Sequence, residues 1–168
     1  MENLVISEFE RNKTIIQQLY ADVDDDMLYW RRSKTKWCLL EIICHLYDEE
    51  RLDFRFRTQW VLDKPNEIPP PFDPIACVED HQYMVQNGSD MVKKWIKERD
   101  LSIAWLKDLK DPNWENAFEH PKRGRMSAKY FLSNWLAHDY LHIRQILKQK
   151  FDYLKLNTGT DLDYAGVW

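Results

Sequence analysis

The sequence predicts an all-α protein with a four-helix bundle, and three features lead to this prediction. Glycine contributes only 4 of the 168 residues, whereas 44% are hydrophobic and 31% are charged, which is typical of long amphipathic helices. Apolar side chains recur every three or four residues in four long segments. Proline-containing stretches separate the second, third and fourth of these segments. Four helices that each carry one apolar face bury those faces in a bundle.

The first long helix is predicted over residues 3–20. Its apolar side chains follow the helical repeat at Val5, Phe9, Ile16 and Leu19. Three consecutive acidic residues at positions 24–26 suit the N-cap and first turn of a short helix, because negative charge is favourable at a helix N-terminus. Residues 31–36 are predicted to form a polar connection.

The second long helix is predicted from Cys38 to about Trp60. Glu41 stands three residues after Cys38, where its carboxylate can accept a hydrogen bond from the N-cap amide. Cysteine takes the place of the Ser or Thr that usually begins this motif. The residues predicted to face inward are Ile42, His45, Glu49, Leu52 and Phe56.

A long crossover is predicted between the second and third long helices. Residues 63–74 contain prolines that block continuation of a helix, at positions 65, 69, 70, 71 and 74. A short helix is predicted over residues 75–85, with Asn87-Gly88 as a stop signal. Ser89 is predicted to cap the third long helix, which ends before Pro112 and turns inward Met91 or Val92, Trp95, Arg99, Ser102, Leu106 and Leu109.

The fourth long helix is predicted to begin after Ser127, whose side chain can cap the first turn. Residues 111–125 before it are predicted to form a loop, because they contain two prolines and a glycine. A tail is predicted from about residue 152. The inward-facing residues of the fourth helix are Phe131, Trp135, His138, His142 and Ile146.

Composition and charge exclude several classes of function. The formal net charge is -4, and no run of basic residues provides the positive field that nucleic-acid binding requires. No segment approaches the roughly 20 apolar residues of a membrane span, and the N-terminus lacks a signal-peptide pattern. Cys38, Cys44 and Cys77 lack Cys-x-x-Cys spacing, so buried thiols are expected rather than disulfides. We expect residues 1–168 to form a single cytoplasmic domain without a nucleic-acid or membrane partner.

Three histidines lie on the predicted inner faces of two helices. His138 and His142 are four residues apart, so their Cβ atoms lie about 5–6 Å apart on one helix face and both rings can bind one ion. His45 provides a third imidazole from the second helix. A single inward histidine is usually a core residue with satisfied hydrogen bonds, but three together compete for few partners unless an ion provides them. The pattern therefore indicates a divalent metal site.

Other polar residues have several interpretations. Glu49 follows His45 by one turn and is a candidate fourth ligand, a hydrogen-bond acceptor for a ligand histidine, or a catalytic base. A structural alternative, slightly favoured, is an ion pair between Glu49 and Arg99. Asp139 points about 100° away from His138 and is expected to pair on another helix. His81 and His120 lie in predicted connections with no partner at chelating spacing, and are expected to be loop histidines.

Two segments resemble the DinB-like superfamily: Trp37-Cys-Leu-Leu-Glu41-Ile-Ile-Cys-His45-Leu, and His138-Asp-Tyr-Leu-His142-Ile-Arg-Gln145-Ile. Arg99, His120-Pro121 with Gly124, and Tyr164-Ala165-Gly166 also resemble one branch. The resemblance implies a bundle with a long crossover between its second and third helices, commonly a homodimer. It also implies a divalent ion such as nickel or zinc bound by three histidines, which fall on His45, His138 and His142.

The resemblance further implies a reaction class. Characterised members include metal-dependent transferases and isomerases that use low-molecular-weight thiols such as mycothiol or bacillithiol. The predicted function is therefore metal-dependent transfer with a low-molecular-weight thiol, with Glu49 as the first candidate base. A metal-dependent hydrolase and a non-catalytic, metal-stabilised helical dimer are the alternatives. No residues for recognising the thiol can be identified in the sequence, so this assignment rests on the fold.

Overall fold

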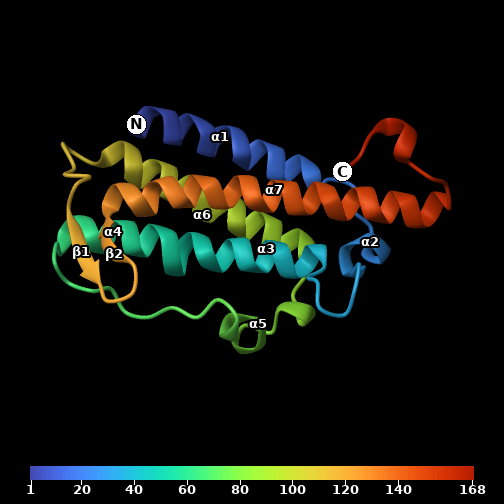
Figure 1. Ribbon diagram of the computed structural model, residues 1–168, viewed down its shortest axis with the longest axis horizontal. Helices are drawn as coiled ribbons and strands as arrows, with labels where there is room; N and C mark the ends of the chain where they lie inside the picture. Colours follow the sequence, from blue (N-terminus) through green and yellow to red (C-terminus); the bar gives the residue numbers. More distant parts are fainter.

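Four long helical units pack side by side (Figure 1). The computed structural model describes all residues from 1 to 168. The predicted four-helix bundle is confirmed, and its units in chain order are α1 (Glu2–Leu19), the continuous run of α3 (Leu39–Asp48), η1 (Glu49–Phe54) and α4 (Arg55–Asp63), then α6 (Gly88–Asp108) and α7 (Ala128–Thr158).

The first turns of two helices follow the predicted capping chemistry. At α2 (Asp25–Tyr29), the Asp24 carboxylate accepts a hydrogen bond from the Met27 amide at 2.8 Å. At α3, the Cys38 amide donates to Oε2 of Glu41 at 2.9 Å. Glu41 thus satisfies an amide that the helix itself leaves without a partner, even though the N-cap residue is cysteine.

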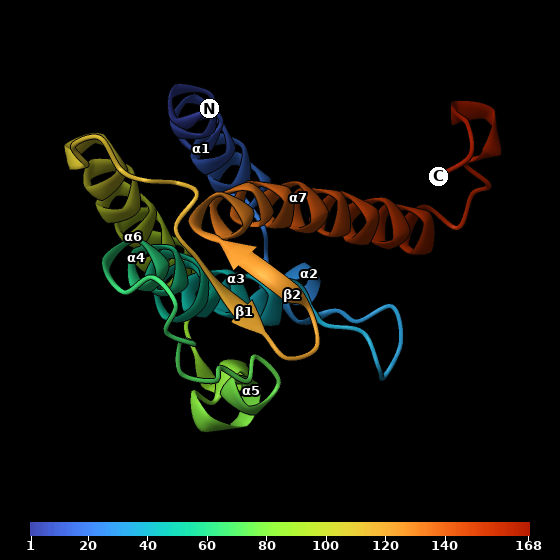
Figure 2. The ribbon, with the colours of Figure 1, turned by 60° about the vertical axis from the view of Figure 1, so that its left-hand side comes forward.

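The predicted long crossover connects α4 to α6 along the outside of the bundle, beside α3 and α4 (Figures 1 and 2). It contains α5 (Ala76–Asp80) and a 3-10 turn, η2 (Tyr83–Val85). The single short helix predicted over residues 75–85 is therefore broken. Gln82 has a φ of 48°, a left-handed conformation that a continuous helix does not contain.

The start of α6 differs from the prediction. Asn87 is its N-cap residue, and the Asn87 side chain accepts a hydrogen bond from the Asp90 amide at 3.0 Å. Asn87-Gly88 is thus a helix start and not a stop, and Ser89 is not the cap, because asparagine caps a helix as well as serine does. A Cβ atom on Gly88 would lie 2.7 Å from Cδ2 of Leu28, so glycine permits α2 to pack closely here.

Part of the predicted loop over residues 111–125 is a β-hairpin. Strands β1 (Ala117–His120) and β2 (Gly124–Ser127) pair antiparallel, with Phe118 opposite Met126. Both side chains are buried in a small cluster beside α4 and α7. Each strand has only four residues, too few to produce a periodic sequence pattern. The hairpin lies across one end of the bundle (Figure 2).

Helix α7 is longer than predicted. Ser127 caps it as expected, but it continues to Thr158 instead of giving way to a tail at about residue 152. It ends at Gly159, whose φ of 60° suits a glycine after the last helical turn. In Figures 1 and 2 its C-terminal part extends beyond the other helices. Neither α7 nor any other helix has the length and apolar character of a membrane span.

A buried arginine on α6 links all four units. Arg99 donates to the Glu50 carboxylate of η1 at 2.8 and 2.7 Å, and to the Asp139 carboxylate of α7 at 2.6 and 2.7 Å. Asp139 also accepts from the side-chain amide of Asn12 in α1 at 3.2 Å. Glu50 accepts from the indole N–H of Trp135 in α7 at 2.9 Å. We call these five residues the Arg99 network.

Apolar and aromatic packing completes the surroundings of Arg99. Its guanidinium carbon lies 4.3 Å from the ring centroid of Phe9 and 5.0 Å from that of Trp95. Burial by itself would lower the pKa of Arg99, but the carboxylates of Asp139 and Glu50 raise it above its ordinary value. The guanidinium therefore stays charged inside the bundle.

Replacement of Arg99 tests how far the bundle depends on it. Arg99→Met leaves two buried carboxylates without their cation, so the free energy of unfolding should fall by about 3–5 kcal/mol in urea denaturation. The exposed pair Lys93–Asp90 provides a control, because Lys93→Met should change the same quantity by less than about 1 kcal/mol. If Arg99→Met does not fold, adding Glu50→Gln and Asp139→Asn should restore folding. Equal effects of Arg99→Met and Lys93→Met would contradict this role.

Candidate metal centre

Helices α3 and α7 bring the three predicted histidines together. Nε2 of His138 lies 3.2 Å from Nε2 of His45 and 3.0 Å from Nε2 of His142. His45 and His142 are buried, and His138 is half-buried. We call these three residues the histidine triad.

The spacing of these nitrogens fits a shared ion. Imidazoles that bind zinc at about 2.0–2.1 Å have nitrogens about 2.9–3.4 Å apart when the angle between them at the metal is about 90–109°. The two distances in the triad fall in that interval. Three nitrogen donors also suit zinc or nickel better than the oxygen-preferring magnesium and calcium ions.

Hydrogen bonding alone does not satisfy the triad. A neutral imidazole has one N–H and one acceptor nitrogen, so Nε2 of His138 cannot form a well-directed hydrogen bond with both of its neighbours. Nδ1 of His45 and Nδ1 of His142 are buried and have no hydrogen-bond partner. A cation among the three Nε2 atoms would use their lone pairs, and the residues present therefore fit a divalent metal.

The protonation state of the triad also suits metal binding. Burial lowers the pKa of His45 to about 3, that of His138 to about 2 and that of His142 to about 4. All three rings are consequently neutral at neutral pH, which is the form that binds a metal ion.

Glu49 lies beside the triad and does not pair with Arg99. Its Oε1 atom is 3.9 Å from Nδ1 of His45, beyond hydrogen-bonding distance. The predicted ion pair with Arg99 is wrong, because Glu50, the next residue, forms it. Burial, reinforced by the nearby Asp53 carboxylate and opposed by Arg57, raises the pKa of Glu49 to about 8. A carboxyl group with such a pKa exchanges protons near neutral pH.

Neighbouring acids at the π-helical segment have different roles. Asp48, Glu49 and Glu50 are all buried, although successive residues of a helix point in different directions. The π-helix η1 begins at Glu49 and inserts a wider turn into an otherwise continuous helix. Glu50 enters the Arg99 network while Glu49 stays near His45. Asp48, Glu49 and Glu50 are three successive acids in a helix that is otherwise largely apolar. Sequence analysis did not use this signal, which indicates that at least one of the acids is buried with a polar partner.

The other polar residues are placed as follows. Asp139 pairs on other helices, as predicted. His81, expected to have no partner at chelating spacing, instead lies with its Nδ1 2.7 Å from the Asp48 carboxylate. The thiol of Cys77 completes a second group whose ligand atoms lie within 4.8 Å of one another. His81 is an exposed histidine in a turn, as predicted, but the expected lack of a partner is wrong. Cys77 stands four residues before it, and the contact with Asp48 arises because the crossover folds back onto α3.

The Asp48 carboxylate in this second group is already saturated. Besides His81, it accepts hydrogen bonds from the Tyr83 hydroxyl at 2.7 Å and from Arg51 at 2.9 Å. The contacts from His81 and Tyr83 attach the crossover to α3. His120, predicted to be a loop histidine, is the last residue of β1, and its Nδ1 accepts from the amides of Lys122 and Arg123 in the hairpin turn.

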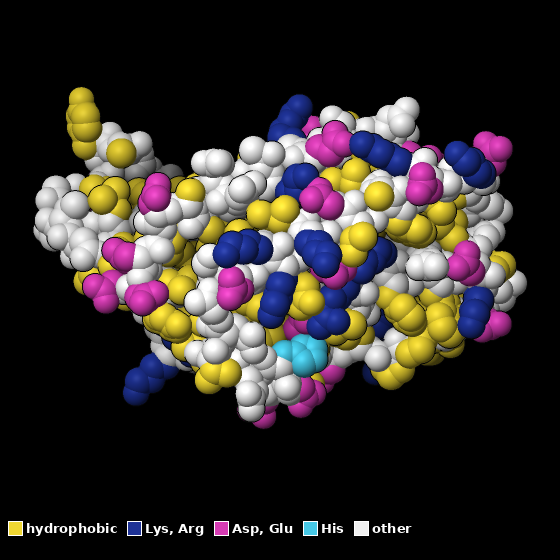
Figure 3. All heavy atoms as spheres, turned by 180° about the vertical axis from the view of Figure 1, so that it is seen from behind, with side chains coloured by type: hydrophobic (Ala, Val, Ile, Leu, Met, Phe, Trp, Pro, Cys, Tyr) yellow, Lys and Arg dark blue, Asp and Glu magenta, His cyan; other side chains and the backbone are white.

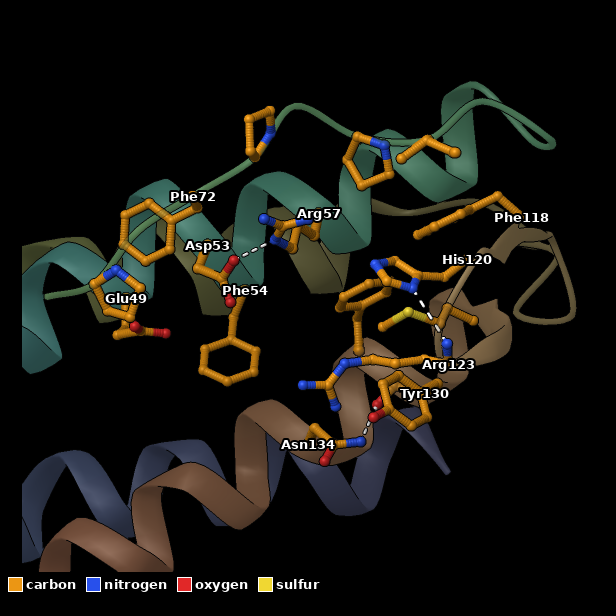
Figure 4. A pocket seen from close by; sticks show the side chains of 16 residues that line it. Glu49, Asp53, Phe54, Arg57, Phe72, Phe118, His120, Arg123, Tyr130 and Asn134 are labelled. Carbon is orange, nitrogen blue, oxygen red and sulfur yellow. Dashed lines mark hydrogen bonds and ion pairs between the residues drawn. The ribbon is translucent and has the colours of Figure 1, made fainter. Parts of the chain in front are cut away.

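A cavity of about 640 Å³ opens beside the triad, which we call the apolar cavity (Figure 4). Glu49 and Phe54 form the part next to the histidines, and the rings of Phe54 and His138 lie 5.0 Å apart. Much of the remaining wall is apolar and comes from the crossover, the hairpin and the first turns of α7, including Phe72, Pro69, Pro71, Phe118, Met126 and Phe131.

A second cavity, of about 430 Å³, approaches the triad through Trp37, whose ring lies 4.7 Å from that of His45. We call it the basic cavity, because its wall contains Arg32, Lys36, Arg144 and Lys148 but the single acid Asp152. Asp152 pairs with Arg32 and Lys148. Lys36 and Arg144 form no ion pair.

Basic side chains also gather on another face of the molecule, where acidic partners accompany them (Figure 3). Figure 3 shows the face opposite to that of Figure 1, where Lys and Arg side chains gather with acidic side chains among them, next to a histidine. Arg51 and Arg55, for example, pair with Asp48 and Glu98. Sequence analysis missed the basic cavity because its cations come from the connection before α3 and from distant turns of α7.

Comparisons with known proteins identify a similar solved structure and the family of this protein. The solved structure of YfiT from Bacillus subtilis matches with a TM-score of 0.78 and 18% sequence identity, over 95% of this chain and 89% of that one. YfiT is described as a probable metal-dependent hydrolase with an unusual four-helix bundle topology. No curated protein matches the sequence. The sequence profile of the DinB superfamily matches residues 8–146, and the protein therefore belongs to that superfamily.

Proposed function

We propose that the histidine triad holds a divalent ion, nickel or zinc, in an enzyme that transfers a low-molecular-weight thiol to an electrophilic substrate. The observation that carries this proposal is the presence of two chemically different cavities that approach the same triad through different neighbours, Phe54 and Trp37. A transfer between two substrates requires two binding sites at one reaction centre.

The bound ion would lower the pKa of a thiol or a water molecule held at the triad. Glu49 is the nearby group that accepts the proton released from the nucleophile, and it then returns that proton to the leaving group. The sulfur atom forms the new bond to the electrophilic carbon as the bond to the leaving group breaks. Buried, neutral histidines and the surrounding Phe54 and Trp37 rings limit access of water to this position.

The basic cavity supports binding of a thiol with negatively charged groups. Lys36 and Arg144 have no counter-ion in the protein, so an anionic ligand gains two favourable interactions without breaking existing ion pairs. The apolar cavity then receives the electrophile.

Hydrolysis is the second candidate, and the description of YfiT favours it. Water would replace the thiol as the nucleophile, while Glu49 and the triad keep the same roles. Product analysis with and without added thiol separates the two reactions, because only a transferase forms a thioether or thioester product. A non-catalytic, metal-stabilised helical homodimer is the remaining alternative. It predicts a large loss of melting temperature with chelator and no turnover.

Metal analysis tests the triad directly. Protein purified without a histidine tag should contain about one nickel or zinc ion per chain. His45→Gln combined with His138→Gln and His142→Gln should abolish this content, measured by plasma mass spectrometry. The control, His81→Gln with His120→Gln, should retain the metal, because neither residue belongs to the triad. Equal metal content in the two variants would show that the ion lies elsewhere.

Glu49→Gln tests the proton-transfer role. It should lower kcat by about 10²–10⁴-fold while metal content stays constant, since glutamine keeps the shape but accepts no proton. Consumption of free thiol in the presence of an electrophile, or release of acid during hydrolysis, provides the assay. Glu98→Gln is a matched control on α6, where the carboxylate pairs with Arg55. Unchanged kcat in Glu49→Gln would remove Glu49 from the reaction.

Charge reversal tests the basic cavity. Lys36→Glu combined with Arg144→Glu should raise the KM for an anionic thiol by about tenfold or more, with a smaller effect at high ionic strength. Lys93→Glu combined with Lys129→Glu makes the same change of charge at exposed positions outside this cavity. The same KM in both variants would refute a specific anion site.

A further inference from the structure

We propose that the electrophilic substrate has an apolar body and a terminal carboxylate, and that Arg123 binds this carboxylate inside the apolar cavity. The inference rests on the proposed function, because it names the substrate class of the same site. It depends on the position, charge and surroundings of one hairpin residue.

The backbone at Arg123 is held in a defined turn. The Arg123 amide donates to the carbonyl oxygen of His120 and to Nδ1 of the same histidine, both at 3.2 Å. Gly124 follows with a φ of 71°, a conformation that glycine adopts without strain. The turn places the Arg123 side chain in the wall of the apolar cavity, and Figure 4 shows this side chain extending into it.

Arg123 differs from the arginines around it in having no counter-ion. Arg57, in the same cavity, pairs with Asp53. Arg125, two residues further along the hairpin, pairs with Glu115 at 3.3 Å and donates to the Glu115 carbonyl oxygen at 2.6 Å. The side chain of Arg123 forms no ion pair and no hydrogen bond. It thus presents a free planar guanidinium, whose paired N–H groups match a carboxylate.

The rest of the cavity defines the other end of the substrate. Phe118 and Phe131 stack with ring centroids 6.2 Å apart and an interplanar angle of 17°, and Phe54 and Phe72 add further aromatic walls. A volume of about 640 Å³ is within the range of small-molecule sites. An aromatic or aliphatic body fits these walls. With its carboxylate at Arg123, the other end of such a molecule is directed along the cavity toward Glu49 and the triad.

Matched pairs of probes separate charge from shape. We choose 3-phenylpropionate with 3-phenylpropionamide, and hexanoate with hexanamide, measured by isothermal titration calorimetry on the metal-containing protein. At least one carboxylate should bind about tenfold or more tightly than its amide, the ratio expected for a charge-assisted, bidentate contact. Arg123→Gln should reduce that ratio to near one. Arg125→Gln, the matched control in the same hairpin, should keep it.

A carboxylate that binds the metal itself is distinguished by the triple histidine variant. Because Arg123 lies on the hairpin, the preference for the carboxylate should persist in this variant without metal. This outcome also separates the inference from the proposed function. If the protein binds the carboxylate more tightly than the amide but transfers no thiol, only the proposed function is refuted. Equal binding of acid and amide, no binding of any probe, or equal losses in Arg123→Gln and Arg125→Gln would overturn the inference. Tighter binding of 2-phenylethylphosphonate than of 3-phenylpropionate would overturn the carboxylate assignment.

Discussion

The buried charges around Arg99 fix how the four helical units face one another. Arg99 reaches two carboxylates on two different units, and a third unit contributes Asn12 to the same cluster. Such a cluster tolerates little displacement, because a buried charge that loses its partner is costly. Asp139 holds α7 in one rotation about its axis, and His138, the preceding residue, is thereby directed toward α3. The geometry of the triad consequently depends on an ion-pair cluster outside it.

One helical unit contributes to both the Arg99 network and the surroundings of the triad. In a regular α-helix Glu49 and Glu50 would differ in direction by about 100°. Within the π-helix η1, Glu50 faces Arg99 while Glu49 lies beside His45 and the apolar cavity. Insertions of this kind are often found at functional sites. A carboxyl group with a raised pKa and a carboxylate locked in ion pairs are thus adjacent in sequence but different in chemistry.

The two cavities beside the triad also differ in chemistry. One cavity has aromatic walls, a paired arginine and a free arginine, whereas the other has four cations around a single acid. Helical residues, including several of α7, form part of both walls. The remainder comes from segments outside the bundle: the crossover and hairpin on one side, and the connection before α3 with Trp168 on the other. Variation in these segments would alter ligand choice without disturbing the bundle.

The sequence by itself determined the helices and the three candidate ligands, because both follow from local periodicity. Spacing placed His138 and His142 on one face, and capping residues such as Asp24, Glu41 and Ser127 marked helix starts correctly. The hairpin, the partner of Arg99 and the contact between His81 and Asp48 were decided by tertiary structure alone. The two polar contacts join segments distant in the chain, and only folding sets their distance. The hairpin strands are neighbours in the chain, but Phe118 and Met126 are buried by packing against distant residues of α4 and α7. The cavities belong to this second group for the same physical reason.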